Sequence, residues 1–305
     1  MSLGFVFPGQ GAQAVGMGGE FLDSDPAVRR RFDEANEALG FDLVSVMLEG
    51  PAERLAETEV TQPALLTVGV ALWDAWCGRG GPRPAVLAGH SLGEYTALAV
   101  SGALSFVDAV RLVHQRGRFM QEAVPVGEGA MAAVLGLEDE TVADCCAGTE
   151  GVVAPANLNA PGQVVISGAA SAVGQAVEAC KEAGARRAVL LNVSGPFHCE
   201  LMRPAAERLR AALDAVEIRQ PEIPVVHNVD AGVAANPEEI RRKLVDQLDS
   251  PVRWRECVLA MRERGADRLV ECGPGNVLAG LVRRIDRALE MASVGTPAAM
   301  EAALQ

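Results

Sequence analysis

A single serine lies between two glycines, in Gly89-His90-Ser91-Leu92-Gly93, where a strand pattern changes to a helix pattern. Residues 85–88 before it are apolar, and residues 92–101 after it are rich in helix formers and are followed by Gly102. A strand-to-helix turn this sharp pushes the serine hydroxyl outward, and the glycines let the turn close without a Cβ clash. The free N–H groups of the new helix and its positive dipole end then face whatever binds beside the serine. The pattern therefore predicts a nucleophile that can carry an acyl group.

The composition narrows the class of protein. The chain has 305 residues, of which 49% are hydrophobic, so it can bury a large core in one domain or in one domain with an insert. A formal net charge of −13 makes nucleic acid and anionic membrane surfaces poor partners. The first residues lack the basic segment of a signal peptide, and no apolar run is long enough to span a bilayer. The seven cysteines are odd in number and form no C-x-x-C pair, so we expect a cytoplasmic protein without disulfides or a metal site.

The first third of the chain predicts strands and helices in alternation. A strand pattern at residues 4–7 runs into the loop Pro8-Gly9-Gln10-Gly11-Ala12-Gln13. Two glycines around a polar residue make a tight loop whose N–H groups can face an anion, although a plain turn explains the same residues. Asp25 can cap a helix that ends at Gly40, and residues 61–76 predict a second, mostly apolar helix.

A further helix is predicted after the capping box that begins at Ser105, and it carries three arginines. Arg111 and Arg118 have polar neighbours at helical spacing and are interpreted as solvated. Arg116 has apolar residues three and four positions away on both sides, so it lies on the buried face. A buried guanidinium keeps its proton and needs an anionic partner or a full set of acceptors. Spacing alone favours a structural salt bridge to an acid such as Glu94 over a role in binding a substrate carboxylate.

Residues 130–193 predict the succession strand, helix, strand, strand, helix, strand. This succession is the ferredoxin-like pattern, and it interrupts the α/β alternation of the rest of the chain. We therefore expect a small subdomain over residues 128–194, inserted into a larger catalytic domain formed by residues 1–127 and 195–305. Within the insert, the polar segment 157–163 is interpreted as a hairpin loop because Asx and Pro-Gly residues favour turns.

Only four histidines are available to act as a base for Ser91. His90 adjoins the serine and should point away from it, and His114 is predicted to face solvent. His227 lies in an apolar strand and is interpreted as a core residue with satisfied hydrogen bonds. His198 follows a Gly-Pro loop at the junction of the two predicted domains, where clefts form. It is the best candidate, because catalytic pairs are built in space and tolerate a long separation in sequence.

Six short motifs occur in order along the chain: Phe7-Pro8-Gly9-Gln10-Gly11-Ala12-Gln13, Gly89-His90-Ser91-Leu92-Gly93-Glu94-Tyr95, Gln115-Arg116-Gly117, Asn157-x-Asn159-x-Pro161-x-Gln163, Pro196-Phe197-His198 and Gly273-Pro274-Gly275. Each is weak alone, but together they span essentially the whole sequence. In this combination the chain resembles the malonyl-CoA:acyl-carrier-protein transacylases of fatty-acid and polyketide synthesis. The resemblance implies an α/β-hydrolase-like large domain with an inserted ferredoxin-like small subdomain, which agrees with the pattern of residues 130–193.

The resemblance implies a ping-pong acyl transfer through an acyl-serine. Ser91 would attack the thioester of malonyl-CoA while His198 takes its proton. The main-chain carbonyl of Gln247 would orient the histidine in place of an acid, and the N–H groups of Gln10 and Leu92 would form the oxyanion hole. The phosphopantetheine thiol of an acyl carrier protein would then accept the malonyl group, with no bound cofactor.

The resemblance also assigns Arg116 to the free carboxylate of the malonyl group, which reverses the choice made from spacing alone. Leu92 and Phe197 resemble residues that select malonyl over methylmalonyl, since a phenylalanine beside the histidine would crowd an α-methyl group. One methyl group is worth about 1–3 kcal/mol in a pocket, so the selection can be incomplete.

The expected carrier protein is acidic, as is this chain, so docking requires a local basic patch. The candidates are Lys181 with Arg186-Arg187, and Arg241-Arg242-Lys243, although either set also fits ordinary surface charge. We expect the chain to be a monomer.

Two other functions stay open. An esterase or thioesterase of the same fold would use Ser91 and His198 equally well, but it has no need for a buried Arg116. A non-catalytic module that docks carrier proteins would have no need for any of the three residues.

Overall fold

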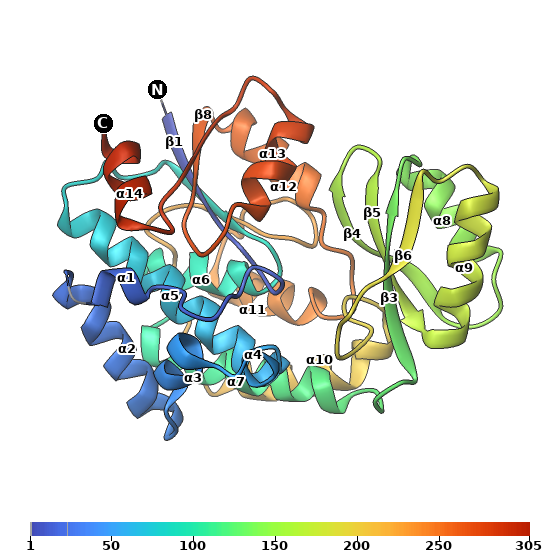
Figure 1. Ribbon diagram of the computed structural model, residues 1–305, viewed down its shortest axis with the longest axis horizontal. Coiled ribbons are helices and arrows are strands. Elements are labelled where there is room, and N and C mark those ends of the chain that lie inside the picture. Colours follow the sequence, from blue (N-terminus) through green and yellow to red (C-terminus); the bar gives the residue numbers. More distant parts are fainter. Residues whose placement is uncertain (1, 23) are drawn as a thin grey trace.

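A five-stranded parallel sheet forms the centre of the larger part of the molecule in the computed structural model, which describes residues 2–22 and 24–305 (Figure 1). Its order is β7-β2-β1-β8-β9, with bounds β1 Ser2–Phe7, β2 Val86–Gly89, β7 Val225–Val226, β8 Ala266–Glu271 and β9 Glu290–Ser293. Strand β1 alternates between two apolar clusters, with Phe5 and Phe7 in one and Val6 in the other. Both faces of this parallel sheet are therefore buried.

Helices cover both faces of the sheet (Figure 1). Helices α5, α6 and α7 contribute to the cluster that contains Phe5 and Phe7, and α12 and α13 contribute to the cluster that contains Val6. The helices of this part are α1 Gly19–Leu22, α2 Pro26–Leu39, α3 Leu43–Glu49, α4 Ala52–Leu55, α5 Thr58–Gly78, α6 Leu92–Val100, α7 Phe106–Glu122, α10 Arg203–Asp214, α11 Pro237–Asp246, α12 Trp254–Glu263, α13 Val277–Ile285 and α14 Pro297–Leu304. Within residues 2–22 and 24–305, no helix has the length and apolar character needed to cross a membrane.

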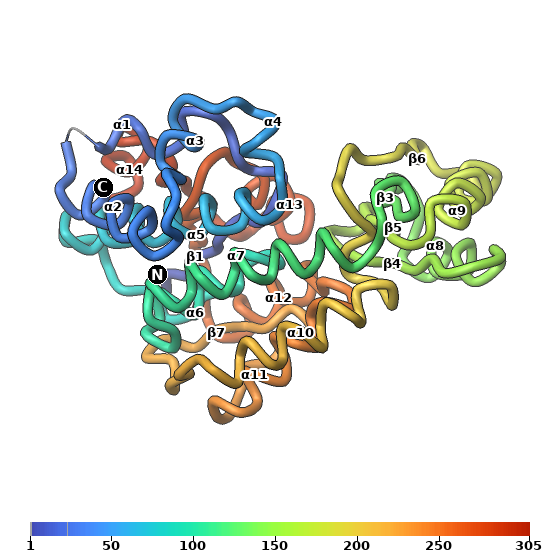
Figure 2. The backbone as a smooth tube through the Cα atoms, turned by 90° about the horizontal axis from the view of Figure 1, so that it is seen from below, coloured from blue at the N-terminus to red at the C-terminus, as the bar shows by residue number. Residues whose placement is uncertain are grey.

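A separate antiparallel sheet lies at one end of the molecule, and α7 leads the chain into it (Figure 2). Its order is β4-β5-β3-β6, with bounds β3 Gly129–Leu135, β4 Val153–Ala160, β5 Gln163–Ala169 and β6 Arg187–Leu190. Helices α8 (Asp139–Ala147) and α9 (Ala170–Glu182) share an apolar cluster with this sheet. The predicted succession of strands and helices in the insert is confirmed. After β6 the chain returns through the short 3₁₀ helix η1 (Glu200–Met202) to α10.

The helix boundaries predicted from capping residues and from a terminal glycine are confirmed for α2 and α7. The side chain of Asp25 accepts a hydrogen bond from the Ala27 N–H at the start of α2, and Gly40 ends that helix with a φ of 73°. The side chain of Ser105 likewise accepts from the Asp108 N–H at the start of α7.

Two predicted boundaries in the insert are wrong. Residues 157–160 belong to strand β4 and not to a hairpin loop, because they pair with β5 and because the Leu158 N–H donates to the Val252 carbonyl at 2.9 Å. Pairing with a distant segment therefore overrides the local turn propensity of the sequence. Strand β6 ends at Leu190, and residues 191–194, predicted as strand up to Val193, form an exposed connection toward His198.

Candidate active site

Ser91 lies on a strained turn between β2 and α6. Its backbone has φ 49° and ψ −104°, a conformation that L-residues rarely adopt. A Cβ on Gly89 would lie 1.8 Å from the Gly93 carbonyl carbon, and one on Gly93 would lie 2.0 Å from the Phe7 oxygen. Both glycines are thus required for the chain to turn this tightly against β1.

Polar side chains from distant elements hold this turn. The Ser91 N–H donates to Asn228 Oδ1 at 2.7 Å, and Asn228 Nδ2 donates to the Gly89 carbonyl at 2.8 Å. Gln247 Nε2 donates to the Ser91 carbonyl at 3.1 Å. Such bonds offset the strain of the turn, because they tie its backbone N–H and carbonyl groups to side chains from elsewhere in the fold.

The structure brings Ser91, His198 and Gln247 together. Ser91 Oγ is 2.7 Å from His198 Nε2, and His198 Nδ1 is 2.8 Å from the Gln247 carbonyl oxygen. Since a carbonyl only accepts, Nδ1 carries the proton and Nε2 is free to accept the proton of the serine hydroxyl. Burial, with a further contribution from the nearby Arg116 cation, lowers the pKa of His198 to about 3. The imidazole is therefore neutral, as a base must be.

Arg116 on α7 is 1% exposed and points at the same serine. Its Nη2 donates to Ser91 Oγ at 3.1 Å and to Gln247 Oε1 at 2.8 Å, and its Nη1 donates to Gln62 Oε1 at 2.9 Å. Among residues 2–22 and 24–305 it forms no ion pair with a carboxylate. The salt bridge to an acid such as Glu94, which spacing alone favoured, does not form, and the guanidinium places a positive charge with no direct ionic partner beside Ser91.

Leu92 follows Ser91 at the start of α6, and the loop that holds Gln10 packs against the same turn. Leu92 is the first residue of α6, so its N–H lacks an acceptor within the helix. The loop that holds Gln10 lies against the turn at Ser91, because a Cβ on Gly9 would be 2.4 Å from the His90 oxygen. The side chain of Gln10 donates to Thr58 Oγ1 at 3.0 Å, which fixes the loop to the start of α5.

Comparison with known proteins assigns the chain to one family. A family model described as acyl transferase domain matches residues 4–300. The chain belongs to the acyl transferase family. It is 52% identical over 303 residues to a malonyl CoA-acyl carrier protein transacylase of Escherichia coli, covering 99% of this chain and 98% of that protein. It is 49% identical over 306 residues to the protein of the same name from Bacillus subtilis, with coverage of 99% and 96%.

Solved structures of similar proteins share the fold of this acyl transferase. An acyl carrier protein S-malonyltransferase from Vibrio cholerae superposes with a TM-score of 0.97 at 49% identity, covering 99% of both chains. A malonyl-transacylase in complex with its type II PKS acyl-carrier protein superposes with a TM-score of 0.98 at 47% identity, covering 100% of this chain and 99% of that chain.

The other three histidines of this acyl transferase have structural partners. His227 Nδ1 is 2.7 Å from Glu94 Oε1, which confirms its prediction as a core residue with a hydrogen-bond partner, and His90 Nε2 is 2.8 Å from Asn159 Oδ1. His114 does not face solvent as expected: it is half-buried, with Nδ1 2.8 Å from the Glu59 carbonyl oxygen.

Sequence reasoning missed three residues that complete the site: Gln62, Asn228 and the side chain of Gln247. The signal that could have found Gln62 is a polar residue on an otherwise apolar helix, and Asn228 follows the apolar strand β7. Both are fully buried, and a buried amide requires partners. Their partners lie on elements far away in the sequence, which no local pattern reveals.

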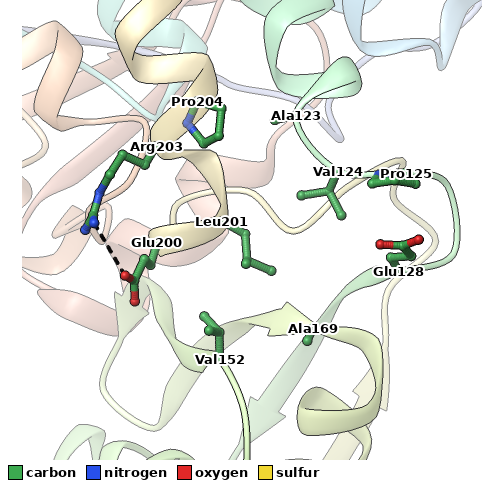
Figure 3. Close-up of a pocket in the computed structure, with 10 residues that line it drawn as sticks. All are labelled: Ala123, Val124, Pro125, Glu128, Val152, Ala169, Glu200, Leu201, Arg203 and Pro204. Atoms are coloured by element: carbon green, nitrogen blue, oxygen red, sulfur yellow. Dashed lines mark ion pairs between the residues drawn. The ribbon is translucent and has the colours of Figure 1, made fainter.

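A surface cavity lies away from this chemistry (Figure 3). It lies where the antiparallel sheet meets the C-terminal end of α7 and the start of α10, and its lining includes Val124, Leu201 and the ion pair of Glu200 with Arg203. Ser91, Arg116 and His198 do not line it. In the part of the chain that the structure describes, no three His, Cys, Asp or Glu side chains gather to hold a metal ion.

We predict that activity is insensitive to mild acid. Because the pKa of His198 is lowered to about 3, kcat/KM, which reports the free enzyme, stays level from about pH 8 to about pH 5. Arg116→Met removes a cause of the shift and raises the pKa of His198, measured by NMR titration of the imidazole. A wild-type His198 that titrates near its ordinary value of about 6.5 contradicts this account.

Proposed function

We propose that this chain transfers a malonyl group from malonyl-CoA to the phosphopantetheine thiol of an acyl carrier protein, in fatty-acid or polyketide synthesis. The observation that carries the proposal is the buried Arg116 guanidinium, whose Nη2 lies 3.1 Å from Ser91 Oγ. An acyl group on Ser91 that ends in a carboxylate would meet this charge and bind it through two hydrogen bonds. Membership of the acyl transferase family and the names of relatives at about half identity support the same reaction.

In the first half-reaction, Ser91 Oγ attacks the thioester carbonyl of malonyl-CoA while His198 Nε2 takes the hydroxyl proton. The N–H groups of Leu92 and Gln10 would donate to the oxyanion of the tetrahedral intermediate. Collapse of that intermediate breaks the C–S bond, and His198 returns its proton to the CoA thiolate. The carrier's phosphopantetheine thiol then attacks the malonyl-serine by the same steps in reverse order. The carbonyl of Gln247 keeps the histidine in the required tautomer throughout.

An esterase or thioesterase is a weaker alternative. Ser91 and His198 suit it, but a generic ester has no charged end to compensate Arg116, and leaving that charge buried is costly. A non-catalytic docking module is weaker still, since it would not need the strained serine or the neutral histidine.

Intact mass spectrometry distinguishes these functions. We expect wild-type protein with malonyl-CoA to gain a persistent malonyl adduct, and to gain little with acetyl-CoA. Ser91→Ala abolishes the adduct, and Arg116→Ala lowers malonyl labelling by about tenfold or more, because a charge-assisted bond worth about 1.5–3 kcal/mol is lost. Free CoA and malonate without an adduct would indicate a hydrolase, and neither adduct nor CoA would indicate the docking module.

Phe197 is proposed to contribute to acyl selectivity. It is 6% exposed and directly precedes His198, and a Cβ on Gly195 would lie 3.1 Å from its ring. We predict that Phe197→Ala raises methylmalonyl-CoA use relative to malonyl-CoA by about tenfold, since one methyl group is worth about 1–3 kcal/mol. The kcat/KM values for the two thioesters provide the test, and an unchanged ratio would show that Phe197 does not contribute to acyl selectivity.

We propose strand β6 as the docking surface for the carrier protein. Arg186 and Arg187 are exposed at its start, and neither pairs with an acid within residues 2–22 and 24–305. Leu190, 62% exposed, continues the surface toward His198. The other candidate cluster is less suitable, because Arg241 and Arg242 pair with Glu238 and Glu239 and Lys243 is buried. Of these two clusters, the one at β6 therefore offers an acidic carrier the more accessible positive charge.

Charge reversal tests this surface. We expect Arg186→Glu with Arg187→Glu to raise KM for the carrier protein by about tenfold, because like charges then face each other. The matched control is Arg241→Glu with Arg242→Glu, which adds the same charge on α11. Equal effects of the two double variants would show that only net charge matters.

We also propose that the larger part, residues 1–127 and 195–305, is α/β-hydrolase-like and that residues 128–194 form a ferredoxin-like subdomain. The parallel order β7-β2-β1-β8-β9 and the antiparallel order β4-β5-β3-β6 support this division.

A further inference from the structure

The carboxamide of Gln247 lies between two buried charges. Its Oε1 accepts from Arg116 Nη2 at 2.8 Å, and its Nε2 donates to Glu94 Oε2 at 2.9 Å. Gln247, Glu94 and Arg116 are each no more than 1% exposed. Only one orientation of the amide satisfies both neighbours, with oxygen toward the guanidinium and nitrogen toward the carboxylate. The amide is therefore oriented by the two charges that it separates.

Glu94 is satisfied without Arg116. Its Oε1 is 2.7 Å from His227 Nδ1, and its Oε2 accepts from the Asn228 N–H at 2.9 Å as well as from Gln247. Arg116 likewise uses the neutral oxygens of two glutamines. Buried opposite charges ordinarily pair directly, so this separation is an unusual feature of the site.

We propose that the side chain of Gln247 is a spacer that keeps Glu94 from neutralising Arg116 and so leaves the guanidinium available to the substrate carboxylate. This rests on the proposed function, in which Arg116 binds the free end of the malonyl group. Direct contact with Glu94 would give the guanidinium an anion before substrate arrives, and malonyl-CoA would have to compete with it. The spacer thereby sets the preference for a dicarboxylic acyl group, a role separate from that of the Gln247 main-chain carbonyl on His198.

Exchanging the two side chains tests the spacer. The double variant Glu94→Gln with Gln247→Glu keeps the composition and net charge but moves the carboxylate into contact with Arg116. We expect the ratio of kcat/KM for malonyl-CoA to kcat/KM for acetyl-CoA to fall by about tenfold or more, mainly through KM for malonyl-CoA. Glu94→Gln alone is the matched control, and it retains the wild-type preference because the carboxylate is removed and not moved.

The single variant Gln247→Glu provides a second test if the exchanged pair folds poorly, and the same fall in ratio is expected. Thermal unfolding with each variant checks that the fold persists. If wild type prefers malonyl-CoA, and the double variant and the single Gln247→Glu variant both keep that preference, the spacer role of Gln247 is wrong while the proposed function stands. If wild type and Arg116→Ala treat the two thioesters alike, the proposed function fails and the spacer with it.

Discussion

The positive charge of Arg116, buried among neutral acceptors, is the interaction on which the rest of the site depends. Two glutamine oxygens and the Ser91 hydroxyl accept hydrogen bonds from the two Nη atoms of the guanidinium without neutralising it, and its buried Nε has no partner among the described residues. The same charge reaches the Ser91 hydroxyl and helps to lower the pKa of His198, so it acts on nucleophile and base together. Together with burial, this cation keeps the base neutral before the reaction, and in the proposed function it would anchor the anionic acyl group. When such an anion binds, it would cancel part of the field that lowers the pKa of His198, and proton transfer to the imidazole would become easier.

The strained turn at Ser91 is the second constraint, and it fixes the neighbouring elements. A φ of 49° at a serine persists only where the surroundings hold the backbone. Here Asn228 binds the N–H of Ser91 and Gln247 binds its carbonyl, and both residues come from the C-terminal third of the chain. The nucleophile is therefore set in place by residues 137 and 156 positions further along the chain.

Local chemistry made much of this arrangement predictable from the sequence. The glycines around Ser91, the helix caps and the apolar neighbours of Arg116 act over a few residues, and the structure follows them closely. The segment from Asn157 to Ala160 forms a strand and not the predicted loop, because it pairs with a distant segment at Val252 that its own residues do not reveal. The expected pairing of Arg116 with Glu94 failed for the same reason, since Gln247 comes between them from another helix end.

The small antiparallel sheet is inserted between Arg116, which precedes it on α7, and His198, which follows it. The chain leaves edge strand β6 and reaches His198 through the short connection 191–197. Although the backbone of His198 follows the inserted sheet in the chain, both nitrogens of its imidazole are held within the larger part, by Ser91 and by the Gln247 carbonyl. The distance between the two reacting atoms is therefore set by the larger part. A carrier protein docked on β6, as proposed above, would lie beside the connection that leads to the base and leave the pair of Ser91 and His198 in place.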